Sequence, residues 1–251
     1  MERLFQGVAE KCKKTEFLET ILKKAHYEED DRELLWSVLE QVLSRMEDGA
    51  DWHAGNVKLA GTADAPEAED LIAQAVVMTL GAGVDELQEE LLGEGKLTEA
   101  YMVEVLGSEI LLLAYGAYNA WIKEHTEFSV KRYYFLGSAK SAEFGGRKVQ
   151  GSDVARSGVE ISLELETLPA ILERSGLPVT CTEGYCMVPK KSVAFYAELT
   201  KDKTVTCEGI CMGCGREDCP NRMAAGERQQ GNRALDRPLT YGYAQILGLF
   251  S

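Results

Sequence analysis

The stretch TEAYMVEVLGSEILLLAYGAYNAWIKE, residues 98–124, decides the fold because it predicts one long helix. Its second half is strongly apolar, and a helix that is apolar on most of its faces has to be covered by protein. The longest apolar run, residues 110–113 extended by Ala114 and Tyr115, is far shorter than the roughly 20 residues that span a bilayer. We therefore predict the central buried helix of the main domain.

Upstream of this stretch, residues 16–46 predict further helix, and the acidic run 28–31 marks a break in it. Their apolar residues recur at helical spacing: Phe17, Ile21, Leu22, Leu34, Leu35, Val38, Leu39, Val42 and Leu43. Residues 49–66 are rich in glycine, alanine and aspartate and predict a linker. Residues 67–79 predict another helix, which Gly81 and Gly83 close as glycine closes helix C-termini.

Downstream, residues 131–135 and 193–199 predict strands, as do residues 179–182 with a weaker pattern. Residues 159–172 fit either a strand or a helix. The class is α+β, with an N-terminal helical part followed by a mixed domain that has a twisted antiparallel sheet and flanking helices. We expect a helical region over 1–60, the mixed domain over 67–206, a metal-binding loop over 207–222 and a tail over 223–251.

Composition narrows the classes of partner. The chain has 251 residues, 45% of them hydrophobic, so it can bury a core. Its net charge of −14 repels nucleic-acid phosphates and anionic membrane surfaces, and it serves either solubility or docking to a basic partner. Charges interrupt the apolar residues at the start, unlike in a signal peptide. We expect a cytoplasmic protein that binds neither nucleic acid nor membrane.

Four cysteines gather near the end of the chain, in the run CEGICMGCGREDCPNR: Cys207, Cys211, Cys214 and Cys219. The glycines between them allow a backbone to wrap tightly around a metal. A reducing cytoplasm disfavours disulfides, so the run predicts a metal site. Cys12, Cys181 and Cys186 are expected to be ordinary core thiols.

The metal itself is an iron–sulfur cluster or zinc, since both take four thiolates. Zinc ribbons usually separate two Cys-x-x-Cys pairs by a long loop, whereas this run is compact. Pro220, directly after the last cysteine, also resembles the Cys-Pro ending of some bacterial cluster loops. We favour a cluster, of the 4Fe–4S type, with zinc as the alternative.

Three stretches together resemble the activation domain of cobalamin-dependent methionine synthase, in its stand-alone bacterial form with a cysteine-rich tail. The first is VVMTLGAGVDELQEELLGEGKLTEAYMVEVLGSE, residues 76–109, in which a Thr-Leu-Gly turn precedes a helix pair ending in Gly-Ser. The second is LPVTCTEGYCMVPKKSVAFYAEL, residues 177–199, with a Gly-Tyr turn and a Pro-x-Lys-Ser-Val ending. The third is the cysteine run. The likeness covers roughly residues 67–222.

The resemblance implies reductive reactivation of a corrinoid protein, with S-adenosylmethionine as methyl donor and the cluster as electron donor. It implies a cofactor-binding site at Gly184, Tyr185, Lys191 and Ser192. The implied partner is a corrinoid-binding protein or methionine synthase subunit that carries the cobalamin, with an electron-donor protein as a further one. No catalytic residue is singled out, and whether the module is itself an enzyme stays open.

Two positions depart from the family pattern. Thr180 stands where full-length members carry an arginine that contacts S-adenosylmethionine, and Leu112 stands where an acidic residue is expected. Lys190 or Lys191 can replace the arginine, although lysine lacks its fork of donors. The alternative function is therefore a non-catalytic protein that binds a corrinoid protein or carries electrons, without S-adenosylmethionine.

Overall fold

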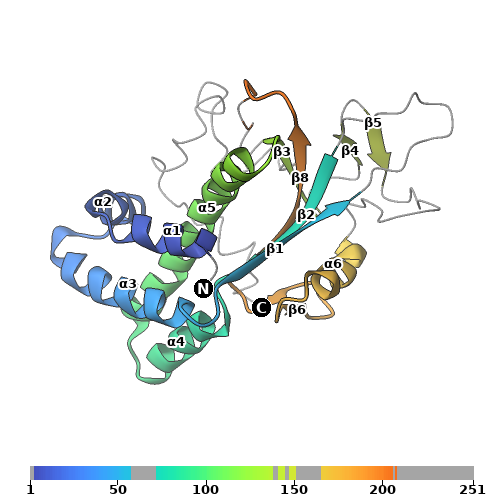
Figure 1. Cartoon of the computed structure of the whole chain (residues 1–251). Helices are drawn as coiled ribbons and strands as arrows, with labels where there is room; N and C mark the ends of the chain where they lie inside the picture. Colours follow the sequence, from blue (N-terminus) through green and yellow to red (C-terminus); the bar gives the residue numbers. More distant parts are fainter. Residues whose placement is uncertain are drawn as a thin grey trace.

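The computed structural model describes residues 3–57, 72–137, 141–144, 147–150, 165–205 and 207. Within these residues the chain is α+β, as the sequence predicts: a helical N-terminal part leads into an antiparallel sheet (Figure 1). The expected metal-binding loop over 207–222 and the expected tail over 223–251 lie almost wholly outside the described residues. The four domain boundaries therefore stay predictions.

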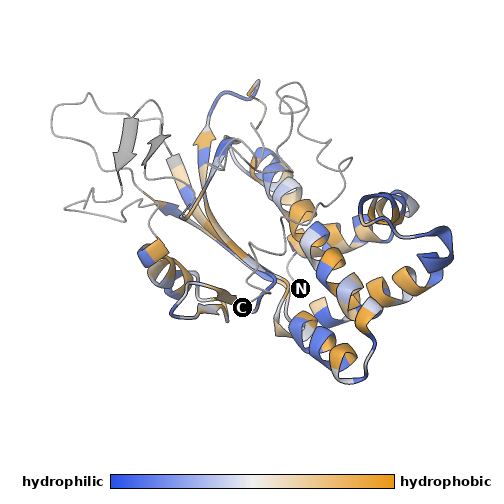
Figure 2. Cartoon of the chain, turned by 180° about the vertical axis from the view of Figure 1, so that it is seen from behind, coloured by the Kyte–Doolittle hydropathy of each residue, from blue (hydrophilic) through white to orange (hydrophobic). Residues whose placement is uncertain are grey.

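The N-terminal part consists of helices α1 (Arg3–Cys12), α2 (Thr15–Lys24) and α3 (Arg32–Met46), with the short 3-10 helix η1 (Glu29–Asp31) between the last two. The predicted helix over 16–46 and its break are confirmed. At the break, Glu28 and Asp31 cap each other's backbone. The helices alternate between orange and blue faces in Figure 2, as amphipathic helices do.

A four-stranded sheet forms the middle of the molecule, in the order β1-β2-β8-β3, with every neighbouring pair antiparallel. Its strands are β1 (Asp51–Val57), β2 (Ile72–Thr79), β3 (Ser129–Phe135) and β8 (Ser192–Thr200). The strands predicted over 131–135 and 193–199 are confirmed as β3 and β8. The central strands β2 and β8 come from distant parts of the sequence, so the sheet brings these parts together.

Two predictions about residues 49–79 are wrong. The expected linker contains β1, and the expected helix over 67–79 contains β2 instead. Strand β2 is central and covered on both faces, so Ala73, Val76, Val77 and Met78 are all buried. A strand of this kind lacks the alternation of apolar and polar residues that distinguishes strand from helix in sequence.

Gly81 does not end a helix, contrary to the sequence prediction, but precedes one. It has a φ of +86°, and a Cβ atom there would lie 2.6 Å from the Cα of Gly49. Helix α4 (Ala82–Gly93) follows it directly, with Gly83 inside its first turn. Glycine is therefore required at position 81 by both backbone conformation and close approach.

Helix α5 (Leu97–His125) confirms the predicted central helix over 98–124. It lies on one face of the sheet, and the N-terminal helices pack against its other side (Figure 1). By length and composition α5 could span a membrane, and 67% of its most apolar window is buried inside the protein. The buried ion pair between Lys24 of α2 and Glu109 of α5, at 2.8 Å, joins the N-terminal part to this helix.

The opposite face of the sheet carries helix α6 (Leu168–Ser175), which follows the 3-10 helix η2 (Leu165–Thr167). A small second cluster forms there from Val77, Leu168, Leu172, Val179 and Ala194. The ambiguous stretch 159–172 is thus helical from 165 onward, and its first residues lie outside the described part. The predicted strand over 179–182 is reduced to β6 (Thr180–Cys181), which pairs with β7 (Met187–Val188). Strands β4 (Ser141–Phe144) and β5 (Arg147–Gln150) form a separate hairpin.

Candidate functional site

The Thr-Leu-Gly turn and the Pro-x-Lys-Ser-Val segment lie against each other. Ser192 donates a hydrogen bond from its hydroxyl to Thr79 Oγ1 at 2.8 Å, across 113 residues of sequence. The same Thr79 oxygen accepts the Gly81 N–H at 3.0 Å, and the Leu80 N–H donates to the Lys191 carbonyl at 2.9 Å. Both Thr79 and Ser192 are buried, so the turn and the start of β8 form one fixed unit.

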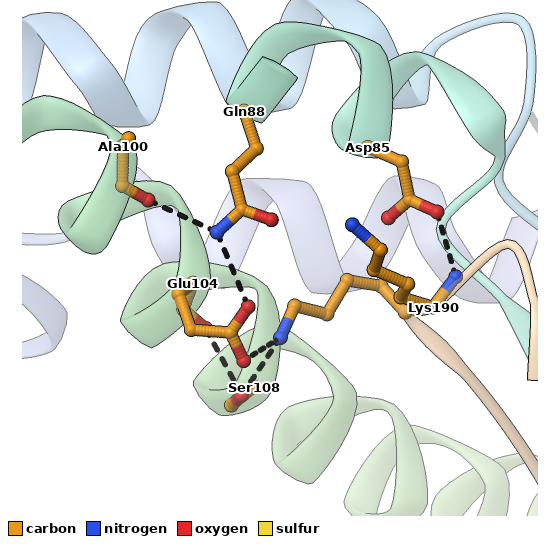
Figure 3. A network of polar contacts seen from close by, with 7 residues as sticks. Asp85, Gln88, Ala100, Glu104, Ser108 and Lys190 are labelled. Atoms are coloured by element: carbon orange, nitrogen blue, oxygen red, sulfur yellow. Dashed lines mark hydrogen bonds and ion pairs between the residues drawn. The ribbon is translucent and has the colours of Figure 1, made fainter. Parts of the chain in front are cut away.

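Lys191 extends from this unit onto α5. Its ammonium forms an ion pair with Glu104 and lies 3.3 Å from the Ser108 hydroxyl (Figure 3). Its stem crosses Gly107, where a Cβ atom would lie 3.0 Å from the lysine Cδ and Cε. The Gly-Ser pair at 107–108 therefore sits in the middle of α5, where glycine makes room for the lysine and serine contacts its charge.

The ion pair between Lys191 and Glu104 is largely shielded from solvent. Its side chain is 5% exposed and that of Glu104 is 15% exposed. Burial lowers the pKa of Lys191, and the neighbouring Glu104 carboxylate opposes that shift. The cost of burying the ammonium is thus partly offset by its partner, and its charge is largely neutralised within the protein.

Residues from α4 complete the network. Gln88 donates to the Ala100 carbonyl at 3.2 Å and to Glu104 Oε2 at 3.3 Å. Asp85 accepts the backbone N–H of Lys190 at 2.7 Å, as Figure 3 shows. Burial raises the pKa of Asp85, and the hydrogen bond from Lys190 counters that effect. The site is therefore a polar junction of α4, α5 and the segment between β7 and β8.

The Gly184-Tyr185 turn connects β6 to β7. Tyr185 has a φ of +61°, which is unusual for a residue other than glycine. Its N–H donates to the Thr182 carbonyl at 2.9 Å, and its ring packs against the small cluster beneath α6. Gly184 is exposed, and a Cβ atom there would meet only Thr182 Oγ1, at 3.8 Å.

The structure thus places the four predicted cofactor-binding residues in two groups. Lys191 reaches the junction on the α5 side. Ser192 is two residues from Ala194 on β8, so its side chain lies on the other face of the sheet, where the Tyr185 ring packs with the α6 cluster. Among them, Gly184 leaves open space beside its backbone. The two departures from the family pattern, Thr180 and Leu112, are exposed and half-buried.

Of the four predicted metal ligands, only Cys207 is described; Cys211, Cys214 and Cys219 lie outside the described residues. Cys207 is half-buried and packs against the main core, beside Tyr118 of α5 and Tyr133 of β3. Within the described ranges no group of three or more histidine, cysteine, aspartate or glutamate residues could hold a metal. The metal site stays a prediction from the cysteine run.

The two candidate regions lie at different points along α5. The Lys191 ammonium contacts Ser108, whereas Cys207 lies beside Tyr118. At a rise of about 1.5 Å per residue, these two contact points are roughly 15 Å apart along the helix axis. Cys207 and Lys191 therefore lie on the same side of the sheet, separated by about three turns of α5.

Sequence reasoning missed three residues of the polar network around Lys191, namely Asp85, Gln88 and Glu104. All three lie within the stretch 76–109, and Glu104 and Ser108 share one face of α5 at a spacing of four residues. Two polar residues four positions apart, one on each side of Gly107, were the signal in the sequence that pointed to this network. No protein-family model matches the chain, and no curated protein matches it either.

Proposed function

We propose that this protein is an activation module for a corrinoid protein, related in function to the activation domain of cobalamin-dependent methionine synthase. The observation that carries the proposal is the contact between the two resembling stretches. The Thr79-Leu80-Gly81 turn and the Lys191-Ser192 segment, far apart in sequence, are joined by hydrogen bonds through Thr79 and Leu80. Motifs that form one site in a family are expected to meet in space, and these do.

In this proposal the Gly184-Tyr185 turn receives S-adenosylmethionine. Gly184 leaves room for a ligand to approach the backbone, and Tyr185 offers a ring edge and a hydroxyl. Lys191 does not fit as the anchor for the ligand's carboxylate, because Glu104 already neutralises it. Lys190 fits better: its side chain is 50% exposed, and its contact with Glu89 is long, at 3.9 Å.

When bound, S-adenosylmethionine would supply a methyl group. The one-electron reduction of the cobalt is energetically uphill, and the irreversible transfer of this methyl group would pull it forward. The chain's own part is to hold that donor over a partner's corrinoid and to deliver the electron. The four-cysteine loop begins at Cys207, which lies on the α5 side of the sheet with Lys191. We place this activity in the cytoplasm, with 4Fe–4S as the cluster.

The second candidate function is a corrinoid-binding or electron-transfer protein that does not bind S-adenosylmethionine. The Lys191–Glu104 ion pair favours it, since a buried cation that is already paired gives a carboxylate ligand no ionic anchor. Thr180 is also exposed on β6 and supplies no charge in place of an arginine.

Calorimetric titration with S-adenosylmethionine separates the two functions. We expect saturable binding to the wild type and at least about tenfold weaker binding to Tyr185→Ala, which is a loss of about 1.4 kcal/mol. Tyr101→Ala is the matched control, because Tyr101 is 53% exposed on α5 and packs beside Tyr27, not in the proposed site. A wild type that does not bind the ligand, but does bind a corrinoid protein, would select the second function.

A further inference from the structure

The chain that leaves β8 turns sharply at residues 201–205. The Asp202 carboxylate accepts hydrogen bonds from the backbone N–H of Thr204 at 2.9 Å and from its hydroxyl at 2.6 Å. The Val205 N–H donates to the Asp202 carbonyl at 3.3 Å. An aspartate that bonds to the backbone two residues further on is one of the side chains that fix turns. The turn is therefore held by its own hydrogen bonds, with Lys203 inside it.

The Lys203 ammonium reaches the end of α5. It donates to the backbone carbonyls of Phe128 at 2.9 Å, Thr126 at 3.0 Å and Lys123 at 3.3 Å. The last carbonyls of a helix have no partner within the helix and carry the negative end of its dipole, so a cation is stabilised there. An ammonium has three N–H donors, and the three carbonyls match them in number. The contact therefore ties the turn after β8 to the link between α5 and β3.

Cys207 follows Lys203 by four residues and packs, half-buried, against the main core. Four residues span at most about 14 Å, so the place of Lys203 limits where the chain can put Cys207. Lys201, in the same turn, lies 4.0 Å from Glu127, and both side chains are at least half exposed. A contact of that kind contributes little. Lys203 is therefore the lysine of the turn whose contacts can hold the chain in place.

We infer that Lys203 is a salt-sensitive strap, which holds the chain after β8 on the end of α5 and so keeps Cys207 packed against the core. Lys203 is exposed, and dissolved ions screen the attraction of an exposed ammonium to a helix dipole. Low salt keeps the strap closed, and high salt or loss of the charge opens it. The inference rests on residues 123–128, 200–205 and 207, and it requires neither the metal nor the corrinoid partner of the proposed function.

The experiment is hydrogen–deuterium exchange of the full chain, read by mass spectrometry in the peptide that covers residues 200–207. Lys203→Met keeps the apolar stem and removes the three donors, so this peptide should exchange several-fold faster than in the wild type at low salt. Raising the salt should speed exchange in the wild type and leave Lys203→Met unchanged. Lys201→Met is the matched control from the same turn, and it should exchange like the wild type at both salt concentrations.

Peptides from α5 and β3 show whether the change is local, and they should exchange alike in all three proteins. Three results would overturn the inference: wild-type exchange of residues 200–207 in a folded Lys203→Met protein, equal acceleration in Lys201→Met, or acceleration that extends throughout α5 and β3. If Lys203→Met does not fold, the salt response of the wild type decides. A wild-type peptide 200–207 that exchanges at the same rate in low and high salt would also overturn the strap.

Discussion

Lys191 and Glu104, 87 residues apart in sequence, form an ion pair whose side chains are 5% and 15% exposed. The pair joins the start of β8 to the middle of α5. It therefore links the Pro-x-Lys-Ser-Val segment to the helix that ends the first resembling stretch. It also decides what Lys191 can do, because an ammonium already neutralised by a carboxylate is a poor anchor for an anionic ligand.

Replacing Lys191 by methionine should destabilise the protein by about 2 kcal/mol, because the variant leaves Glu104 largely buried without its partner. Lys190→Met is the control: its side chain is 50% exposed, so the free energy of unfolding should change by less than about 0.5 kcal/mol. Urea denaturation of both variants measures the difference. Equal losses in the two variants would show that the pair does not hold the junction together.

The stability contributed by Lys191 should depend on pH. Burial lowers its pKa below the ordinary 10.5, so the folded state loses the proton before the unfolded state does. As the pH rises toward 10.5, the unfolded state binds more protons, and the free energy of unfolding increases. The difference between wild type and Lys191→Met should therefore shift in favour of the wild type as the pH approaches 10.5 from below. A shift in the opposite direction would contradict the buried state of the ammonium.

Gly81→Ala should cost at least about 2 kcal/mol, because alanine is strained at φ +86° and its Cβ would lie 2.6 Å from the Gly49 backbone. Gly116→Ala is the matched control. Gly116 is exposed on α5, and nothing lies within 4 Å of a Cβ there, so alanine should stabilise the helix by up to about 1 kcal/mol. Thermal unfolding of the two variants should thus move in opposite directions, and a tolerated Gly81→Ala would refute the close contact of the two glycines.

Anaerobically purified protein should be brown, with the broad visible absorption of cysteine-ligated iron. Cys211→Ser or Cys214→Ser should abolish the colour, because each removes one of the four proposed ligands. Cys186→Ser should keep it, since Cys186 is exposed at the β6–β7 turn, outside the cysteine run. Metal analysis accompanies the spectrum. Colourless protein with one zinc per chain would replace the cluster by zinc and keep the four-thiolate site.

The local elements were predictable because their patterns are local. The long apolar stretch gave α5 to within one residue at each end, and the β-branched and aromatic residues of β3 and β8 gave two of the four sheet strands. Strand β2 was mistaken for helix because both of its faces are buried. Strand β1 was mistaken for linker because glycine, alanine and aspartate are common in it and before it.

The site was predictable only in part. Lys191 and Ser192 were singled out by their motif; Lys191 lies at the junction, and Ser192 bonds to Thr79 next to it. Glu104, which pairs with Lys191, and Asp85, which accepts the Lys190 N–H, were not singled out. Nothing in a helix sequence tells which charged residue will face a segment that returns about 90 residues later. Tertiary packing decides which charged residue faces the segment, through the way α4 and α5 pack against the end of β7.

The central claim is reactivation of a corrinoid protein, and an absorption spectrum of the cobalt tests it most directly. Candidate corrinoid proteins from the same genome are prepared in the cob(II) state and mixed with S-adenosylmethionine and a one-electron reductant, with and without this chain. We predict conversion to the methylated cobalt only when the chain is present, more slowly for Tyr185→Ala, and weaker complex formation as salt rises. No complex in any cobalt state, and no spectral change with any of these proteins, would contradict the account.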